Sequence, residues 1–244
     1  MNNELFSFFL TCISGFSTLI GYFVINLKKD KRKLLASSLY FASGVMLLVS
    51  VIDLIPSSFN YINSYYFVIF AILLVLFFIT LGIVISMMID KFLPDNNDNI
   101  YHLGIMTMLV IILHNLPEGI ITYITSTSDI KLGISLTLAI AMHNIPEGIS
   151  IAVPIYYATK SKKKAFLYTL ISGFSEPLGA IISYLFLAKY VNNVILGFLF
   201  AIIAGIMIHI ACYELLPNAK KQGYDKGFWF FFLGMLVMLL SEVG

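Results

Sequence analysis

The stretch HNLPEG occupies residues 114–119 and HNIPEG returns at residues 143–148, inside a chain that is otherwise strongly apolar. Of the 244 residues, 59% are hydrophobic and 11% are charged, whereas an average soluble domain carries about 25% charged residues. This composition indicates an integral membrane protein. The formal net charge of +2 is too small to indicate a nucleic-acid partner.

Apolar stretches of membrane-spanning length lie on both sides of the two motifs. A hydrocarbon core about 30 Å thick requires about 20 helical residues. Eight stretches approach this length, at residues 5–27, 34–55, 65–89, 101–125, 131–158, 165–188, 194–217 and 225–243. We therefore predict an all-α integral membrane protein with eight transmembrane helices in a single domain.

The basic residues alternate between the connections of these predicted spans. The first, third, fifth and seventh connections hold 13 of the 15 lysine and arginine residues, and only Lys131 and Lys189 fall in the others. Connections rich in lysine and arginine stay in the cytoplasm, according to the positive-inside rule. The odd connections are therefore predicted to be cytoplasmic and both termini extracytoplasmic.

Two pairs of similar stretches flank the motifs. They are SGFSTLIG at 14–21 with SGFSEPLG at 172–179, and GVMLLVSVIDLIP at 44–56 with GIMIHIACYELLP at 205–217. Their offsets, 158 and 161 residues, nearly agree. We therefore predict an inverted 3+2+3 arrangement, with repeats at 1–90 and 165–244 around a central helix pair at 101–158. Many secondary transporters are built from inverted repeats.

Ionisable residues interrupt the predicted spans. A charged residue at the membrane centre costs about 2.5–3.5 kcal/mol on insertion scales, so such residues are usually functional. The spans contain the acids Asp53, Glu118, Glu147, Glu176 and Glu214 and the histidines His114, His143 and His209.

The spacing within each motif predicts a pair of metal ligands. Residues i and i+4 share one face of a helix, so His114 lies beside Glu118, and His143 beside Glu147. Imidazole and carboxylate ligands suit Zn²⁺ and neighbouring divalent ions. One such pair could equally be a hydrogen-bonded polar pair, but its duplication on adjacent helices favours metal. With Glu176 as a third carboxylate, the ligands suffice for two cations bridged by the motif glutamates.

Each motif also contains a proline, which cannot donate a backbone hydrogen bond. We expect Pro117, Pro146 and Pro177 to loosen their helices and release carbonyl groups. Broken helices are tolerated in membranes where they line a site.

These motifs, together with SEPLGA at 175–180, resemble the ZIP (Zrt-, Irt-like protein) metal transporters, particularly the compact bacterial members. The resemblance extends over residues 1–244 and implies one transporter domain in the bacterial inner membrane. It implies uptake of divalent ions toward the cytoplasm and an elevator-like motion of spans 1, 4, 5 and 6. It implies neither an enzyme nor a cofactor. The expected partners are metal ions and the lipid bilayer, with a homodimer as an open alternative.

The resemblance also assigns ligands to two metal positions. It implies a first site of His114, Glu118, His143 and Glu147 with Met46 nearby, and a second of Asn115, Glu118, Asn144, Glu147 and Glu176. Zn²⁺ is the expected cargo, and Fe²⁺, Mn²⁺, Co²⁺ and Cd²⁺ suit the same ligands.

Competing interpretations exist for the chain and for single residues. An intramembrane hydrolase could use Glu118 or Glu147 as a general base on metal-bound water, although two equivalent motifs argue against one asymmetric active site. A structural or sensor protein could hold metal without moving it. His209 is either an exit-path ligand or a buried hydrogen-bonded histidine, Met46 could be core packing, and we interpret His102 as interfacial.

The repeat pairs Asp53 with Glu214, each three residues before a proline that is expected to end its span. Because the repeats are inverted, we expect Asp53 to guard the outer mouth of the pathway and Glu214 the inner one. Alternatively, both acids only cap helix ends.

Overall fold

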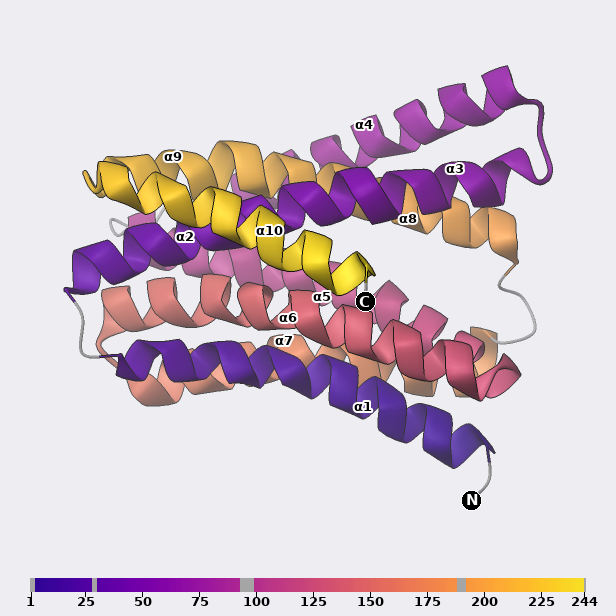
Figure 1. Ribbon diagram of the computed structural model, residues 1–244, viewed down its shortest axis with the longest axis horizontal. Coiled ribbons are helices and arrows are strands. Elements are labelled where there is room, and N and C mark those ends of the chain that lie inside the picture. Colours follow the sequence, from indigo (N-terminus) through magenta and orange to yellow (C-terminus); the bar gives the residue numbers. More distant parts are fainter. Residues whose placement is uncertain (1–2, 28–29, 93–98, 188–191, 244) are drawn as a thin grey trace.

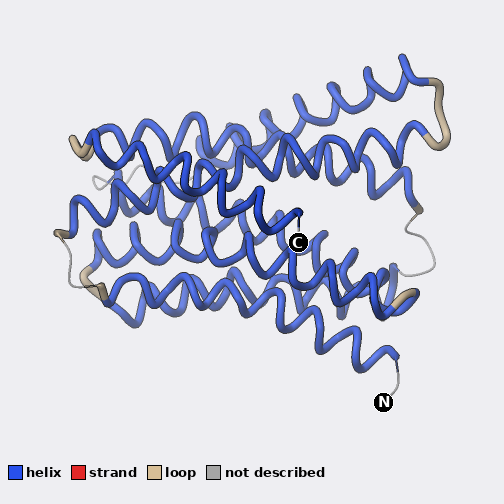
Figure 2. Tube along the Cα trace, viewed as in Figure 1, coloured by secondary structure: helices blue, strands red, loops and turns tan. Residues whose placement is uncertain are grey.

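The computed structural model describes residues 3–27, 30–92, 99–187 and 192–243, and the regular elements within these ranges are all helical (Figure 2). Lys28, Lys29, Lys189 and residues 93–98 of the third connection lie outside the described residues. The α-helices are α1 (Asn3–Tyr22), α2 (Lys31–Val49), α3 (Ile55–Asn63), α4 (Val68–Phe92), α5 (Asn99–Ser128), α6 (Ile130–Thr159), α7 (Lys162–Ile182), α8 (Asn193–His209), α9 (Leu216–Lys221) and α10 (Trp229–Val243). They run roughly side by side along the long axis (Figure 1). The prediction of an all-α membrane protein is confirmed.

Among the described residues, seven helical segments are long and apolar enough to cross a membrane. They are Asn3–Asn26, Lys31–Asn63, Val68–Phe92, Ile100–Ser128, Ile130–Thr159, Lys162–Phe186 and Asn193–Lys221. The eighth predicted span corresponds to α10, which has 15 residues. At 1.5 Å per residue this is about 22 Å, shorter than a hydrocarbon core of about 30 Å. The count of eight spans therefore stays a prediction.

Two of these segments continue past the prolines that were expected to end them. A π-helical turn at Ser50–Leu54 joins α2 to α3, and another at Ile210–Leu215 joins α8 to α9. A proline ring clashes with the carbonyl of residue i−4, and the wider π turn gives that carbonyl room. Asp53 and Glu214 lie in these turns, inside continuous helical segments, and neither side chain caps a helix.

The motif prolines do not break their helices either. Pro117 lies within α5, Pro146 within α6 and Pro177 within α7, and each helix is continuous around its proline. The expected interruption at the motifs is therefore wrong. Packing against neighbouring helices holds the backbone helical although each proline removes one hydrogen bond.

The helices pack in two groups. In the first group α1 packs on α6 and α7, while α5 packs on α6 and α7. In the second group α2 packs on α10 and α4 packs on α8. The groups meet where α2 packs on α6. The packed pairs correspond two by two. In the first group the pair α1 and α6 corresponds to the pair α7 and α5. In the second group the pair α2 and α10 corresponds to the pair α8 and α4.

Glycines bring the helix backbones into direct contact within both groups. A Cβ atom on Gly148 would overlap the carbonyl oxygen of Thr18, and one on Gly119 would overlap that of Glu176. No side chain larger than hydrogen fits at either position without moving a helix. The second group has the same close approach at four pairs: Gly44 with Phe231, Gly234 with Phe41, Gly205 with Ile79, and Gly82 with Ile202.

Apolar side chains cover much of the outside, while ionisable ones lie within. On α4, Ile69 is 75% exposed and Phe77 is 61% exposed, whereas Glu118 and Glu147 are at most 4% exposed. Such a distribution suits a lipid solvent, in which exposed apolar surface is not penalised. The buried polar residues of the two motifs therefore share the interior of the first helix group.

Candidate metal centre

The two motifs meet where α5 packs against α6. The ring centroids of His114 and His143 are 6.1 Å apart. Both histidines, together with Glu118 and Glu147, are no more than 4% exposed. Four groups able to bind a metal ion are thus held together away from lipid.

Carboxylate oxygens lie between the imidazoles. Nε2 of His114 is 3.3 Å from Oε1 of Glu118 and 3.1 Å from Oε1 of Glu147, and Nε2 of His143 is 3.1 Å from Oε1 of Glu118. Ligand atoms of His114, Glu118 and His143 all lie within 4.8 Å of one another. His114 lies beside Glu118, as its spacing predicts. The second predicted pair is not found: among the described residues His143 makes no ion pair with Glu147 and instead pairs with Glu118 across the two helices.

Several of these buried atoms have no hydrogen-bond partner among the described residues. They include Nε2 of His114, Oε1 of Glu147, Oε2 of Glu118 and Oδ1 of Asn144. Nε2 of His114 and Oε1 of Glu147 are close but not in hydrogen-bonding geometry. A buried polar atom left unpaired costs about 1–3 kcal/mol. A cation bound beside Nε2 of His114 and Oε1 of Glu147, which are 3.1 Å apart, would give both atoms a partner.

Glu176 of α7 extends the cluster on one side. Nδ2 of Asn144 donates to Oε1 of Glu176, and also to the carbonyl oxygen of Ser14 at 2.9 Å. The Ser14 hydroxyl donates to Oε2 of Glu176. Ser14 of α1 therefore orients a predicted ligand, a role that sequence reasoning missed. The only available signal was its place in the SGFS stretch that recurs at 172–175.

Glu147 connects the imidazole side of the cluster to the amide side. Its Oε1 lies 3.1 Å from Nε2 of His114. Its Oε2 accepts from Nδ2 of Asn115 at 3.3 Å, in the amide orientation that satisfies both ends of Asn115. One carboxylate thus faces residues from both predicted metal positions, as a bridging ligand must.

A cavity of about 180 Å³ leads from this cluster toward Asp53. Glu118 and His143 line it, and so do Ser57 and Tyr61, which lie beyond Asp53 along α3. Oδ1 of Asp53 accepts a hydrogen bond from the Ser57 hydroxyl at 3.1 Å. Asp53 and the motif residues therefore face one continuous space.

The other candidate residues lie apart from this cavity. Nδ1 of His209 is 2.9 Å from the Ser86 hydroxyl oxygen, so His209 is buried and hydrogen-bonded. Met46 is 1% exposed and belongs to the apolar core. Glu214 is half-buried in the second π-helical turn, where its backbone carbonyl accepts from Nδ2 of Asn218 at 2.8 Å.

His102 lies near the start of α5. Its Nε2 is 2.8 Å from Oδ1 of Asp90 in α4, and the His102 side chain is 19% exposed. This pair ties two helix ends together, which fits its interpretation as an interfacial residue.

Comparison with known proteins decides the family. Residues 95–242 match the family described as ZIP Zinc transporter. The chain belongs to the ZIP family. Three relatives named zinc transporter ZupT are similar over nearly their whole length. The protein from Clostridium perfringens is 37% identical, covering 99% of this chain and 96% of the relative; that from Campylobacter jejuni is 39% identical, covering 95% and 94%; that from Streptococcus mutans is 38% identical, covering 99% and 98%.

ZIP membership confirms several predictions made from the motifs. ZIP proteins transport divalent metal ions and are not enzymes, so the hydrolase interpretation is set aside. The apolar helices and the bacterial relatives place the chain in the inner membrane. A buried cluster of histidine and glutamate suits zinc, the ion named for the family.

Proposed function

We propose that this ZIP protein carries Zn²⁺ toward the cytoplasm through a binuclear site formed by α5, α6 and α7. The observation that carries the proposal is the set of buried, unpaired ligand atoms on His114, Glu118, Asn144 and Glu147. Other divalent ions that accept nitrogen and oxygen ligands, Fe²⁺, Mn²⁺, Co²⁺ and Cd²⁺, would compete for the same atoms.

The first ion is bound by the two histidines and the two motif glutamates. The second lies on the side of Asn115, Asn144 and Glu176, and shares Glu118 and Glu147 with the first. Carboxylates offset the charge of two divalent ions, while neutral imidazoles and amides add ligands without further charge. Met46 would complete the first site only by approaching from the apolar core, and its role rests on family resemblance.

An inverted repeat explains the paired contacts between helices. Thr18 and Glu176, which are 158 residues apart, occupy matching places against Gly148 and Gly119. In the second group Gly44 and Gly205, 161 residues apart, occupy matching places against α10 and α4. We infer repeats at 1–90 and 165–244 around the central pair at 101–158. In this arrangement α10 matches α4 and is the eighth transmembrane element.

The direction of uptake rests on the family resemblance, and the distribution of lysine and arginine supports the orientation of the chain in the membrane. The lysine-rich connections face the cytoplasm and both termini face outward. The cavity beside Asp53 then faces outward, and apolar side chains of Val110, Met207 and Ile210 fill the interior toward Glu214. Release to the cytoplasm requires the two helix groups to shift, with α1, α5, α6 and α7 moving together because glycine contacts join their backbones.

Metal flux into proteoliposomes tests this proposal. Purified protein is reconstituted around a zinc-sensitive dye, and we expect zinc influx for the wild type. Glu4→Gln is a control that changes an exposed acid at the start of α1. Wild-type protein that binds zinc but supports no influx would instead establish the structural or sensor interpretation.

A further inference from the structure

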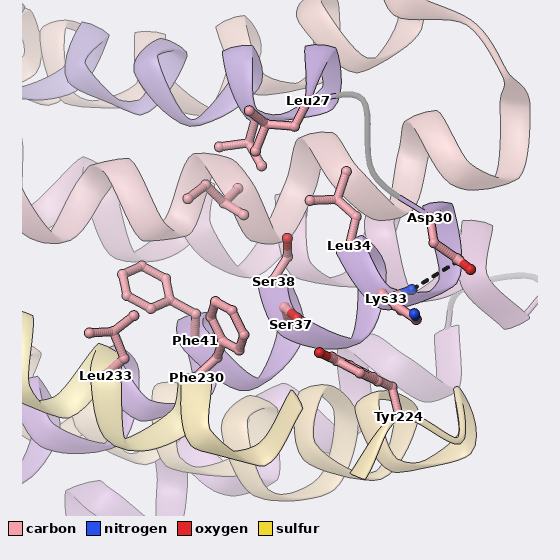
Figure 3. A pocket seen from close by; sticks show the side chains of 12 residues that line it. Leu27, Asp30, Lys33, Leu34, Ser37, Ser38, Phe41, Tyr224, Phe230 and Leu233 are labelled. Atoms are coloured by element: carbon pink, nitrogen blue, oxygen red, sulfur yellow. Dashed lines mark hydrogen bonds between the residues drawn. The ribbon is translucent and has the colours of Figure 1, made fainter. Parts of the chain in front are cut away.

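A cavity of about 500 Å³ lies between the short segment that follows α1 (residues 23–27) and the helices α2, α6 and α10, at the end of the molecule where α2 begins (Figure 3). It occupies the seam between the two helix groups. Leu27 and Ile149 line it from the first group, and Phe41 and Leu233 line it from the second. Helix packing therefore leaves an open space where the groups face each other.

The lining of this seam cavity is amphiphilic. Lys33 and Tyr224 lie at one end, while Phe41, Phe230 and Leu233 lie at the other (Figure 3). The ammonium group of Lys33 is 5.9 Å from the centroid of the Tyr224 ring. The cationic end is the end of the molecule at which the lysine-rich connections meet, and the apolar end points toward its middle.

The positive charge at the mouth is available for an anion. Asp30 lies nearby, but its Oδ1 accepts from the backbone amides of Arg32 and Lys33, at 2.9 and 3.4 Å, and so caps α2. Among the described residues, no carboxylate lies within ion-pair distance of the Lys33 ammonium. Lys31, Arg32 and Lys33 are all exposed in the first turn of α2.

The matching place at the opposite end of the molecule is filled. In the repeat proposed above, the offset of 161 residues between α2 and α8 matches Ser37 with Phe198. The contacts of Gly44 with Phe231 and of Gly205 with Ile79 match α10 with α4, so Phe230 matches Phe78. The rings of Phe78 and Phe198 are stacked with centroids 4.2 Å apart. Ser37 lines the seam cavity and provides no such ring. A serine in place of a phenylalanine therefore opens the space at the lysine-rich end.

We propose that the seam cavity binds one anionic phospholipid from the leaflet at the lysine-rich end. Its phosphate lies at Lys33 and Tyr224, and an acyl chain follows Leu34, Phe41 and Leu233. Basic pockets between transmembrane helices bind anionic headgroups in this way. The lipid contacts both helix groups. Its binding does not depend on which ion the central site carries.

Native mass spectrometry of the full chain, extracted from vesicles of equal phosphatidylglycerol and phosphatidylcholine, tests this proposal. We expect wild-type protein to retain one phosphatidylglycerol in preference to phosphatidylcholine. Lys33→Gln should reduce the preference about fivefold, the effect of one cationic residue at an anionic surface. The matched control Lys131→Gln, at the opposite end, should leave it unchanged.

Ser37→Phe provides the sharper test, because it introduces at this end of the molecule the ring that Phe198 contributes to the stack at the opposite end. We expect retention of phosphatidylglycerol to be lost while the melting temperature is kept. If this variant does not fold, Ser37→Leu fills the same space with a smaller side chain. Equal retention of both lipids by the wild type, or full retention by a folded variant with the cavity filled, would overturn the proposal.

Added inorganic phosphate should not displace the retained lipid, because the acyl chain contributes to binding; displacement by phosphate alone would contradict a lipid site. Zinc flux is recorded separately in the same vesicles. Selective lipid retention without flux would reject the proposed transport route and leave the lipid site standing, whereas flux without retention would do the reverse.

Discussion

The motifs on α5 and α6 differ in one letter but have different surroundings. Asn144 on α6 donates to Glu176, whose other oxygen accepts from the Ser14 hydroxyl. In the similar stretches SGFSTLIG and SGFSEPLG, the residue aligned with Glu176 is Thr18, which brings no carboxylate. The hydroxyl of Ser172, which matches Ser14, has no hydrogen-bond partner among the described residues. Two motifs of nearly identical sequence therefore have unequal hydrogen-bonding surroundings.

Repulsion between like charges disfavours a fourth carboxylate near the motifs. Glu118, Glu147 and Glu176 already place three buried carboxylates near one another, where like charges repel strongly. A fourth at Thr18 would add repulsion in the empty site and hold the ions more tightly in the filled one.

The largest expected loss of zinc flux comes from the glutamates, which both motifs contain. Glu118→Ala and Glu147→Ala should each reduce zinc flux by more than about 100-fold, because in the proposed site each removes a ligand shared by both ions, and loss of an outer-shell partner alone costs about 10- to 100-fold. Flux into proteoliposomes, with equal protein per vesicle, measures this. Normal flux through either variant would show that the ions do not share these glutamates.

Substitution of the two motif histidines should weaken zinc binding to different extents. His114 approaches both glutamates, whereas His143 approaches only Glu118. We expect about 10- to 100-fold weaker zinc binding for His114→Ala and a smaller loss for His143→Ala. Isothermal titration with zinc measures both. A larger loss for His143→Ala would reverse this ranking of the two motifs.

The asparagines test the asymmetry directly. Asn144→Ala should weaken the second ion about tenfold, because Glu176 loses a donor that positions it. Asn115→Ala should have a smaller effect, and Ser14→Ala should resemble Asn144→Ala. The stoichiometry of bound zinc distinguishes these outcomes. Equal effects of the two asparagine variants would mean that the second site is not one-sided.

The smallest effects are expected at the mouths. Asp53→Asn should raise the apparent KM for zinc about fivefold, since the cavity loses a charge worth about 1 kcal/mol near water. Glu214→Gln should instead lower maximal flux, because the matching acid lies on the release side. Initial rates over a range of zinc concentrations separate the two. The same kinetic change in both variants would argue against distinct mouths.

The all-α membrane architecture could be predicted from the length and composition of the apolar stretches. The prediction failed where local rules met tertiary packing. Pro56 and Pro217 suggested helix ends, but a π-helical turn before each lets the segment continue. Pro117 and Pro146 suggested breaks, but close packing keeps α5 and α6 continuous.

Spacing predicted one of the two contacts within a helix and did not predict the contact between helices. The i to i+4 rule places Glu118 beside His114, as observed, but it cannot set the relative height of α5 and α6, which brings His143 to the same carboxylate. Ser14 had no distinctive pattern of its own, because buried serines commonly donate to their own helix backbone. Its contact with Glu176 depends on how α1 crosses α7.

The last letter of each motif has a consequence for mutational tolerance. Gly119 and Gly148 offer no ligand atom, yet each leaves no room for a methyl group against the backbone of a neighbouring helix. In a saturation screen for growth on scarce zinc, these glycines should reject substitution as strictly as the glutamates beside them. A screen that scores only rejected substitutions would therefore classify these glycines as metal ligands. Measurement of bound zinc in purified variants would distinguish a glycine needed for helix packing from a residue that binds the metal.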